Sequence, residues 1–302
     1  MKLSEKALSI SPSPTLSIDA KYKEMLANGE DVVGFGAGEP DYDTPDHIKV
    51  AAVEAIKKGF TKYTPASGTL ELKKAICKKF ADDNGLIYKP SDIVVSNGAK
   101  HSLVNVFSAI LNPGDEVIIP APFWVSYPEM VKLADGVPVV ISTTEEAGFK
   151  FTPSQLKAAI TPKTKAIIIN SPSNPTGMVY SKEELLEIAK IAVEKNIFVV
   201  SDEIYEKLIY DGDGHISIAS LGEDIKKLTI VVNGVSKSYA MTGWRIGYTA
   251  STPEIAAIMG NVQSHATSNP CSISQAATVA ALLGPQDRSE EHTSELQSPN
   301  TI

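Results

Sequence analysis

The fold is decided by Ile197-Phe198-Val199-Val200-Ser201-Asp202-Glu203-Ile204-Tyr205, an apolar run that passes directly into acidic residues. Four consecutive β-branched or aromatic residues predict a strand that is buried on both faces. A carboxylate directly after such a strand is costly to bury unless a cation meets it. The stretch therefore predicts a parallel strand whose carboxyl end carries Asp202, either as part of a ligand site or as the N-cap of a following helix.

Six further β-branched runs lie on both sides of this strand, at 93–95, 117–119, 137–141, 166–169, 229–232 and 246–249. Segments typical of helices separate them, near 99–111, 124–133, 153–160, 181–195 and 253–266. This alternation predicts an α/β fold with a mostly parallel sheet between two layers of helices. Such a sheet binds ligands at the carboxyl ends of its strands.

Composition excludes several classes of protein. The 302 residues include 28 Lys+Arg and 36 Asp+Glu, a net charge of −8, which disfavours nucleic acid as a partner. Residues 1–6 mix charges, and no apolar run reaches membrane-spanning length, so we expect a cytoplasmic protein with no membrane partner. Cys77 and Cys271 lack metal-ligand spacing, so we expect reduced structural thiols and no metal site.

A lysine among small and apolar residues follows the strand expected at 229–232, in Val235-Ser236-Lys237-Ser238-Tyr239. This setting favours a lowered lysine pKa and Schiff-base chemistry over a solvated surface charge. The Ser236 hydroxyl and the Arg245 guanidinium together suit a phosphate dianion.

A glycine turn connects a strand to a helix in Ser96-Asn97-Gly98-Ala99-Lys100. The free N–H groups at the start of that helix form a seat for an anion. A second glycine-rich loop, at 34–38, has Gly-x-Gly-x-Gly spacing, and Pro40 and Pro45 prevent a helix from following it at once. A nicotinamide dinucleotide site is therefore disfavoured.

A rigid turn is expected at Asn170–Gly177, because two prolines follow Ser171 and Asn174. An amide at Asn174 is well placed there to donate to an oxygen anion. Trp124 offers a flat face for stacking on a ligand, with packing in the core as the alternative.

Together these segments resemble the class I aminotransferases, pyridoxal-phosphate enzymes of the aspartate aminotransferase type. Four motifs occur in the family's order, namely Gly38–Asp41, Asn170–Gly177, Ser201–Tyr205, and Ser236-Lys237 leading to Gly243–Gly247. The sequence of Trp124–Met130 is similar to that of the bacterial branch of the family, which acts on aspartate. The resemblance implies fold type I of the pyridoxal-phosphate enzymes, with a seven-stranded sheet and a small second domain that is largely missing here.

The resemblance implies three catalytic residues, Lys237, Asp202 and Tyr205. Lys237 would bond covalently to the aldehyde of pyridoxal 5'-phosphate and, once displaced, would move the proton of the substrate α-carbon. Asp202 would face the pyridine nitrogen and keep it protonated, so that the ring accepts an electron pair. Tyr205 and Asn174 would donate to the phenolic oxygen.

The resemblance also implies the remaining contacts of cofactor and substrate. Trp124 would stack on the cofactor ring, and Gly38, Trp124 and Asn174 would border the substrate. Tyr63 matches a tyrosine that reaches the phosphate of the other subunit, which implies a homodimer with shared active sites. The phosphate would be held by Gly98, Ala99, Lys100, Ser236 and Arg245.

The chain is expected to have three parts. Residues 1–45 would form an N-terminal arm and a segment of the small domain, and residues 46–284 the large cofactor-binding domain. Residues 285–302 would be a non-native or disordered tail, because Arg288–Ser298 is similar to the translation of a sequencing-library adapter. The family's carboxylate-clamping arginine would lie beyond this point, so we expect a fragment that keeps the cofactor site but is poorly active.

Several functions stay open at the level of sequence. The expected reaction transfers the amino group of an L-amino acid, foremost aspartate, to a 2-oxo acid such as 2-oxoglutarate. An aromatic, alanine or broad-range class I aminotransferase is an alternative, and the same cofactor also supports decarboxylation, racemisation and β-elimination. A non-catalytic aminotransferase-like domain of a regulator is a further alternative, although residues 1–45 hold no basic DNA-binding module.

Overall fold

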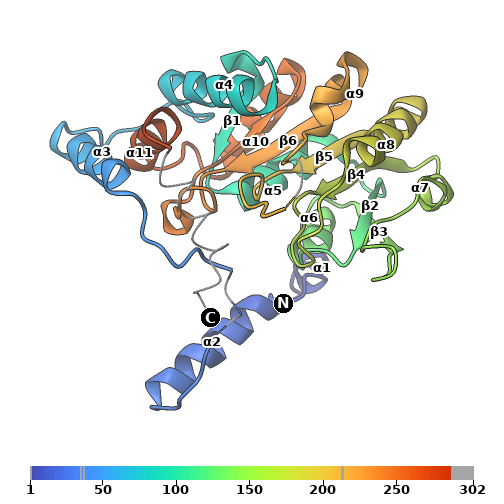
Figure 1. Ribbon diagram of the computed structural model, residues 1–302, viewed down its shortest axis with the longest axis horizontal. Coiled ribbons are helices and arrows are strands. Elements are labelled where there is room, and N and C mark those ends of the chain that lie inside the picture. Colours follow the sequence, from blue (N-terminus) through green and yellow to red (C-terminus); the bar gives the residue numbers. More distant parts are fainter. Residues whose placement is uncertain (1, 35, 37, 212–213, 287–302) are drawn as a thin grey trace.

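A seven-stranded sheet forms the centre of the protein (Figure 1). The computed structural model describes residues 2–34, 36, 38–211 and 214–286. The strand order is β1-β7-β6-β5-β4-β2-β3, and β7 runs antiparallel to β1 and β6 while all other neighbours are parallel. The mostly parallel sheet of seven strands expected from the sequence is confirmed.

Strands and helices alternate along the chain. The strands are β1 (Ile93–Ser96), β2 (Glu116–Ala121), β3 (Val137–Ser142), β4 (Thr164–Asn170), β5 (Phe198–Asp202), β6 (Thr229–Gly234) and β7 (Gly247–Ala250). The α-helices are α1 (Glu5–Leu8), α2 (Pro14–Ala27), α3 (Asp46–Lys57), α4 (Leu70–Asn84), α5 (Ala99–Ile110), α6 (Ser126–Leu133), α7 (Pro153–Ala159), α8 (Lys182–Lys195), α9 (Glu223–Leu228), α10 (Pro253–Ala266) and α11 (Ser272–Leu283). Short 3₁₀ turns lie at Pro90–Asp92, Ile218–Leu221 and Thr242–Trp244. None of the helices in the described ranges is long and apolar enough to cross a membrane.

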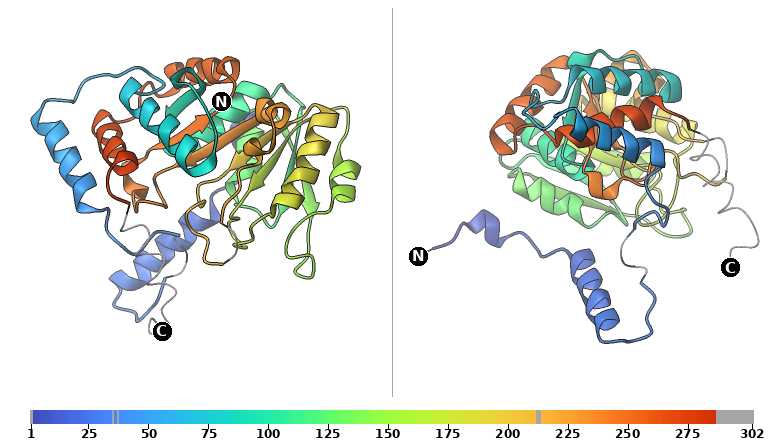
Figure 2. Two further views of the ribbon diagram at one scale, coloured as in Figure 1. Left: turned by 45° about the horizontal axis from the view of Figure 1, so that its top comes forward. Right: turned by 90° about the vertical axis from the view of Figure 1, so that its left-hand side faces the viewer.

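Helices cover both faces of the sheet, as expected for a parallel arrangement (Figure 2). Alternate residues of each strand point to opposite faces, so that Val94 packs in one core cluster and Val95 in another. The face that carries Val95 is covered by α3, α4 and α11 at one end and by α7, α8 and α9 at the other. The opposite face is covered by α5, α6 and α10. Hydrophobic residues packed on both faces of the sheet therefore hold the strand ends in place.

Helix α4 is not among the helices expected from the sequence, although local signals for it exist. The Thr69 side chain accepts a hydrogen bond from the Leu72 N–H and caps the helix. Leu72, Ile76 and Phe80 follow at four-residue spacing, and all three are fully buried. This stripe is the pattern of a helix that packs on one face.

Thr44 is not the N-cap of α3, although the sequence Thr44-Pro45 predicts a helix that is capped by the threonine. Pro45 takes the cap position and α3 begins at Asp46. The Thr44 hydroxyl instead donates to the Ala240 carbonyl at 2.6 Å and accepts from Trp244 Nε1 at 3.0 Å. This tertiary contact ties the segment before α3 to the loop that follows Lys237.

The N-terminal helices lie outside the body formed by the sheet and its two helix layers (Figure 2). Helix α2 has no buried residue. The arm touches the body through the ion pair of Lys6 with Asp135 at 2.7 Å and through the Ser11 N–H, which donates to Glu129 at 3.0 Å. The predicted boundary at residue 45 stays a prediction, and most of the predicted tail, residues 287–302, lies outside the described residues.

Candidate active site

The carboxyl ends of β4 and β5 bring two of the predicted site segments together. Asn170 ends β4, and it is paired in register with Asp202, which ends β5. Asn170 Nδ2 donates to the Asp202 carbonyl at 3.0 Å, and Asn170 Oδ1 accepts from the Asn174 N–H at 2.7 Å. Asn170 therefore positions the turn that carries Asn174, a role that the motif alone does not reveal.

Asp202 is a buried carboxylate, 3% exposed, at the end of a central strand. Its Oδ2 accepts from the Tyr127 hydroxyl at 2.7 Å, and its Oδ1 accepts from the Ile204 N–H at 3.3 Å. In the described parts of the chain no lysine, arginine or histidine pairs with it. The helix N-cap alternative is wrong, because a series of turns follows β5.

Burial raises the pKa of Asp202 to about 6, against the opposing effect of hydrogen bonds from Tyr127 and the Ile204 N–H. The acid is thus poised to titrate near neutral pH. A cationic group of a ligand would complete its environment, because a buried carboxylate without a partner is costly.

Tyr127 is a site residue that the sequence analysis missed. It lies in the first turn of α6, is fully buried, and packs edge-on against Trp124 with ring centroids 5.4 Å apart. The Tyr127 N–H donates to the Trp124 carbonyl at 3.0 Å, and this turn at the start of α6 brings the two rings together. Its bond to Asp202 could not be predicted, since it depends on how α6 packs against β5.

Tyr127→Phe is expected to raise the pKa of Asp202 above about 6, because the buried carboxylate loses its hydroxyl donor. The measurement is the carboxyl ¹³C titration of Asp202 in the ligand-free protein. Tyr180→Phe is the matched control, since Tyr180 is a buried tyrosine that packs against Phe151 instead. Equal titration curves for both variants would contradict the prediction.

Lys237 follows β6 and lies beside two other predicted residues. Its Nζ donates to the Gly38 carbonyl and lies 5.6 Å from the centroid of the Tyr205 ring. Burial lowers the pKa of Lys237, the Arg245 charge acts in the same direction, and Glu39 opposes them. Asn174 Nδ2 in turn donates to the Tyr205 hydroxyl at 3.4 Å.

A cavity of about 340 Å³ opens at this point. Gly38, Tyr205 and Lys237 contribute to its wall. A desolvated amine at the edge of a cavity is suited to attack a carbonyl group, because it is a free base near neutral pH more often than a surface lysine.

The Arg245 guanidinium lies beside the start of α5, where the sequence predicts an anion seat. Gly98 caps α5 with φ +86°, and a Cβ at this position would overlap Arg245 Nη2. A Cβ at Gly247 would likewise overlap the backbone N of Ala99. The first N–H groups of a helix have no acceptor within it, so those of Ala99 and Lys100 are free to bind an anion next to the arginine.

Gly98→Ala is expected to weaken phosphate binding by about tenfold, because the added methyl group displaces the guanidinium. Gly114→Ala is the control, since Gly114 also has φ +86° but would place its Cβ in open space. Both variants should lose about 1 kcal/mol of stability through the left-handed backbone. Calorimetry with inorganic phosphate, together with thermal unfolding, separates the two effects, and equal phosphate affinities in both variants would count against the seat.

The positions of three other predicted site residues differ in their burial and contacts. Lys100 Nζ lies 4.8 Å from the centroid of the Trp124 ring. Ser236 is buried in the turn after β6. Tyr63 is 92% exposed and does not line the cavity of its own chain.

Comparison with known proteins agrees with this arrangement. The family "Aminotransferase class I and II" matches residues 30–299. The aspartate aminotransferase of Bacillus sp. (strain YM-2) is 59% identical over 289 residues, which are 96% of this chain and 74% of the relative. The crystal structure of the aspartate aminotransferase from Rhizobium meliloti superposes with a TM-score of 0.94 at 47% identity, over 98% of this chain and 74% of that one. The Thermus thermophilus aspartate aminotransferase with maleate gives 0.93 at 46% identity, over 98% and 76%.

The chain thus spans about three quarters of the length of these relatives. The match covers the strand ends at Asn170 and Asp202, the lysine after β6, and the anion seat at α5. Shared sequence over nearly the whole chain and a shared fold lead to the same assignment: the chain belongs to the class I and II aminotransferases.

Proposed function

We propose that the protein transfers the amino group of L-aspartate to a 2-oxo acid such as 2-oxoglutarate, with pyridoxal 5'-phosphate as cofactor. Its family uses this cofactor, and the relatives named above are aspartate aminotransferases. The observation that carries the proposal is the environment of Asp202. This carboxylate is buried, and none of the described basic side chains pairs with it, so the site calls for a cationic ligand group.

The chemistry of the residues fits each part of the cofactor. Asp202 suits a protonated pyridine nitrogen, and the desolvated amine of Lys237 suits the aldehyde. The N–H groups at the start of α5, with Arg245 and Ser236, suit the phosphate. Tyr205 and Asn174 suit the phenolic oxygen.

When bound, pyridoxal phosphate supplies an electron-poor ring that accepts the electron pair released when the substrate α C–H bond breaks. Asp202 would hold the proton on the pyridine nitrogen. Lys237, as an amine of lowered pKa, would take the α-proton from the substrate and then deliver it to the cofactor. Trp124 would cover one face of the ring and exclude water from it.

The residual positive charge of the site supports an anionic substrate, a class that includes dicarboxylates such as aspartate. Lys100, Lys237 and Arg245 bring three positive charges to the site, and Glu39 is the acid that acts on the Lys237 pKa. One positive charge is expected to be lost when Lys237 reacts, and the phosphate occupies Arg245. Lys100 lies over the Trp124 ring, and no carboxylate in the described ranges forms an ion pair with it. Maleate, bound in the Thermus thermophilus structure, is a ligand of this dicarboxylate class.

A homodimer is part of the proposal, because α3 and the loop after it expose a run of large apolar side chains. These are Val50, Val53, Ile56, Phe60 and Tyr63. An exposed apolar stripe of this kind marks a protein interface. A second copy on this face would cover the exposed Tyr63 side chain, which would then reach the phosphate seat of the partner subunit.

Mixing two inactive or weakened variants tests the shared site. Lys237→Ala supplies an intact Tyr63, and Tyr63→Phe supplies an intact Lys237. We expect the mixture, after co-expression, to regain one site with wild-type affinity for the cofactor, because the two intact residues meet across the interface. A mixture whose cofactor affinity equals that of Tyr63→Phe alone, or a chain that sediments as a monomer, would contradict the dimer.

A spectroscopic titration tests the activity. The chain is saturated with pyridoxal phosphate, and the visible band of the bound cofactor is followed. L-aspartate should bleach the band, 2-oxoglutarate should restore it, and oxaloacetate should appear. Bleaching by L-phenylalanine or L-alanine instead would assign another aminotransferase, release of carbon dioxide would assign a decarboxylase, and failure to form the band would refute the cofactor.

A further inference from the structure

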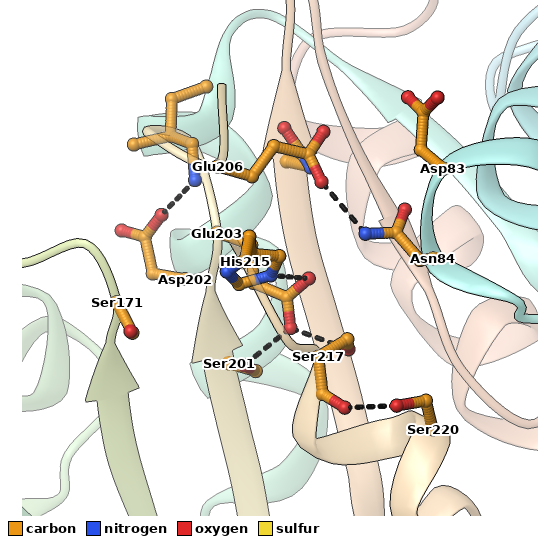
Figure 3. Close-up of polar contacts among 12 residues, drawn as sticks. Asp83, Asn84, Ser171, Ser201, Asp202, Glu203, Glu206, His215, Ser217 and Ser220 are labelled. Carbon is orange, nitrogen blue, oxygen red and sulfur yellow. Dashed lines mark hydrogen bonds and ion pairs between the residues drawn. The ribbon is translucent and has the colours of Figure 1, made fainter. Parts of the chain in front are cut away.

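A second group of buried charges lies on the other side of β5 from Asp202 (Figure 3). Ser201 and Glu203 alternate with Asp202 along the chain, so their side chains point to the opposite face of the sheet. Glu203 Oε1 accepts from the Ser201 hydroxyl at 2.8 Å and from the Ser217 hydroxyl at 2.7 Å. Glu203 Oε2 lies 3.0 Å from His215 Nε2. The Glu203 carboxylate is therefore held from three directions.

A second buried ion pair follows one turn later. Glu206 pairs with Lys79 of α4, and Asn84 Nδ2 donates to Glu206 Oε2 at 2.9 Å. Lys79 Nζ also donates to Asn84 Oδ1 at 2.8 Å. At the rim, Lys207 pairs with Asp83 at 3.1 Å. Each buried acid on this face of the sheet therefore has a base.

The buried charges of the segment from β5 to Glu206 do not balance. It carries three buried acids, Asp202, Glu203 and Glu206, and two buried bases face it, His215 and Lys79. The acid without a base is Asp202, which is the one on the side of the active site.

On the basis of the function proposed above, we propose that Glu203 and His215 are positioning residues for Asp202. Their ion pair, clamped by Ser201 and Ser217, anchors the end of β5 on one face so that the Asp202 carboxylate is aimed at the cofactor on the other. The His215 charge also offsets part of the charge of Glu203, so that Asp202 can stay ionised next to it.

Electrostatics supports this coupling in both directions. Glu203 raises the pKa of Asp202, in addition to the larger effect of burial. Burial acts to raise the pKa of Glu203 itself, but His215 and the two serine hydroxyls lower it overall. Burial acts to lower the pKa of His215, but Glu203 raises it overall. An imidazolium is thus held beside Glu203 by the carboxylate that it neutralises.

The other charged and titratable groups around these residues come from four elements. Tyr127 of α6 and Tyr205 face Asp202. Lys79 of α4, Glu206 and Tyr88 act on the side of Glu203 and His215. Variants that leave all of these unchanged therefore isolate the Glu203–His215 pair.

Three glutamine variants test the proposal. Glu203→Gln keeps an oxygen for the two serines and an N–H that can donate to a neutral His215. His215→Gln removes the imidazolium and leaves Glu203 without its base. Glu206→Gln is the matched control, because it also removes one buried, paired acid of the same segment but has no contact with Asp202.

The readouts are the carboxyl ¹³C titration of Asp202 in cofactor-free protein and the pH dependence of pyridoxal phosphate affinity. We expect the Asp202 midpoint to fall by about one pH unit in Glu203→Gln and to rise by about one unit in His215→Gln. Cofactor affinity should follow, weakening at pH 7 in His215→Gln and recovering at pH 8.5. Glu206→Gln should lower the melting temperature and leave the midpoint as in wild type.

A purely structural role would give a different result. If Glu203→Gln and His215→Gln lower only the melting temperature, or shift the Asp202 midpoint no more than Glu206→Gln does, the proposal is overturned. The cofactor-free titration decides the matter even if the wild type fails to bind pyridoxal phosphate, an outcome that would refute the proposed function separately.

Discussion

Lys237→Ala is expected to lower kcat for transamination between aspartate and 2-oxoglutarate by at least about 10⁴-fold. Under the proposed function, the substitution removes both the amine that would react with the cofactor aldehyde and the base that would move the α-proton. The neighbouring Tyr205 hydroxyl is a poor substitute as a base, because burial raises its pKa. The measurement is the steady-state rate at saturating cofactor, together with the pH dependence of the visible band, which should disappear.

Lys207→Ala is the matched control for this loss. Lys207 also contributes to the wall of the cavity, but it pairs with Asp83 and has no contact with Tyr205 or Gly38. Its removal should change kcat by less than about twofold, as is usual for exposed ion pairs. Added ethylamine should partly restore the rate of Lys237→Ala, since a small amine fits the space left by the side chain. Retention of more than one per cent of the activity by Lys237→Ala, without added amine, would exclude it as the reacting lysine.

Asp202→Asn is expected to lower kcat by about 10³-fold and, at the same time, to stabilise the cofactor-free protein at pH 7. A neutral amide cannot keep the pyridine nitrogen protonated. It does remove a buried charge, whose pKa is raised from 3.8 to about 6 at a cost of about 3 kcal/mol. Part of this gain is lost, because the amide N–H₂ faces a donor, either Tyr127 or the Ile204 N–H. A net gain of about 1 kcal/mol is therefore expected.

The sign of the pH dependence follows from the raised pKa. Consider a group whose pKa is higher in the folded than in the unfolded protein. It stabilises the fold at pH values below its pKa in the unfolded protein, and this stability is lost as the pH rises through its pKa in the folded protein. The wild type should therefore lose stability between pH 4 and 6, and Asp202→Asn should not. Urea unfolding of cofactor-free protein at pH 4.5 and 7 measures the difference, with the exposed Asp224→Asn as control. Greater instability of Asp202→Asn at both pH values would contradict the argument from burial.

Much of the sheet could be predicted because each strand is indicated by a short stretch of its own sequence. The runs at 166–169, 197–200 and 229–232 are uninterrupted and β-branched except for Ala166 and Phe198, and each lies in a buried central strand. The predicted site followed from the same pattern, since carboxyl ends of parallel strands meet at one edge and carry their polar residues with them. Asn174, Tyr205 and Lys237 are near one another for this reason.

Other parts of the site depend on packing between distant segments. Tyr127 reaches Asp202 because α6 packs against the same face of the sheet to which Asp202 points. Thr44 has the sequence context of a helix cap, yet the loop after Lys237 offers it two better partners. Such contacts join residues that are 75 to 200 positions apart, so no local sequence pattern predicts them.

The sequence by itself determined the α/β class, the order of the strands along the chain and the residue types at their carboxyl ends, because hydrophobic period and turn chemistry act over a few residues. Only the tertiary structure decided which acid remains without a base. The local hydrophobic pattern does not separate the adjacent carboxylates of Asp202 and Glu203, although the family resemblance singles out Asp202. The extended backbone at the end of β5 turns Glu203 toward His215 and Asp202 toward Tyr127 on the opposite face, and this separation leaves Asp202 without a basic partner among the described residues.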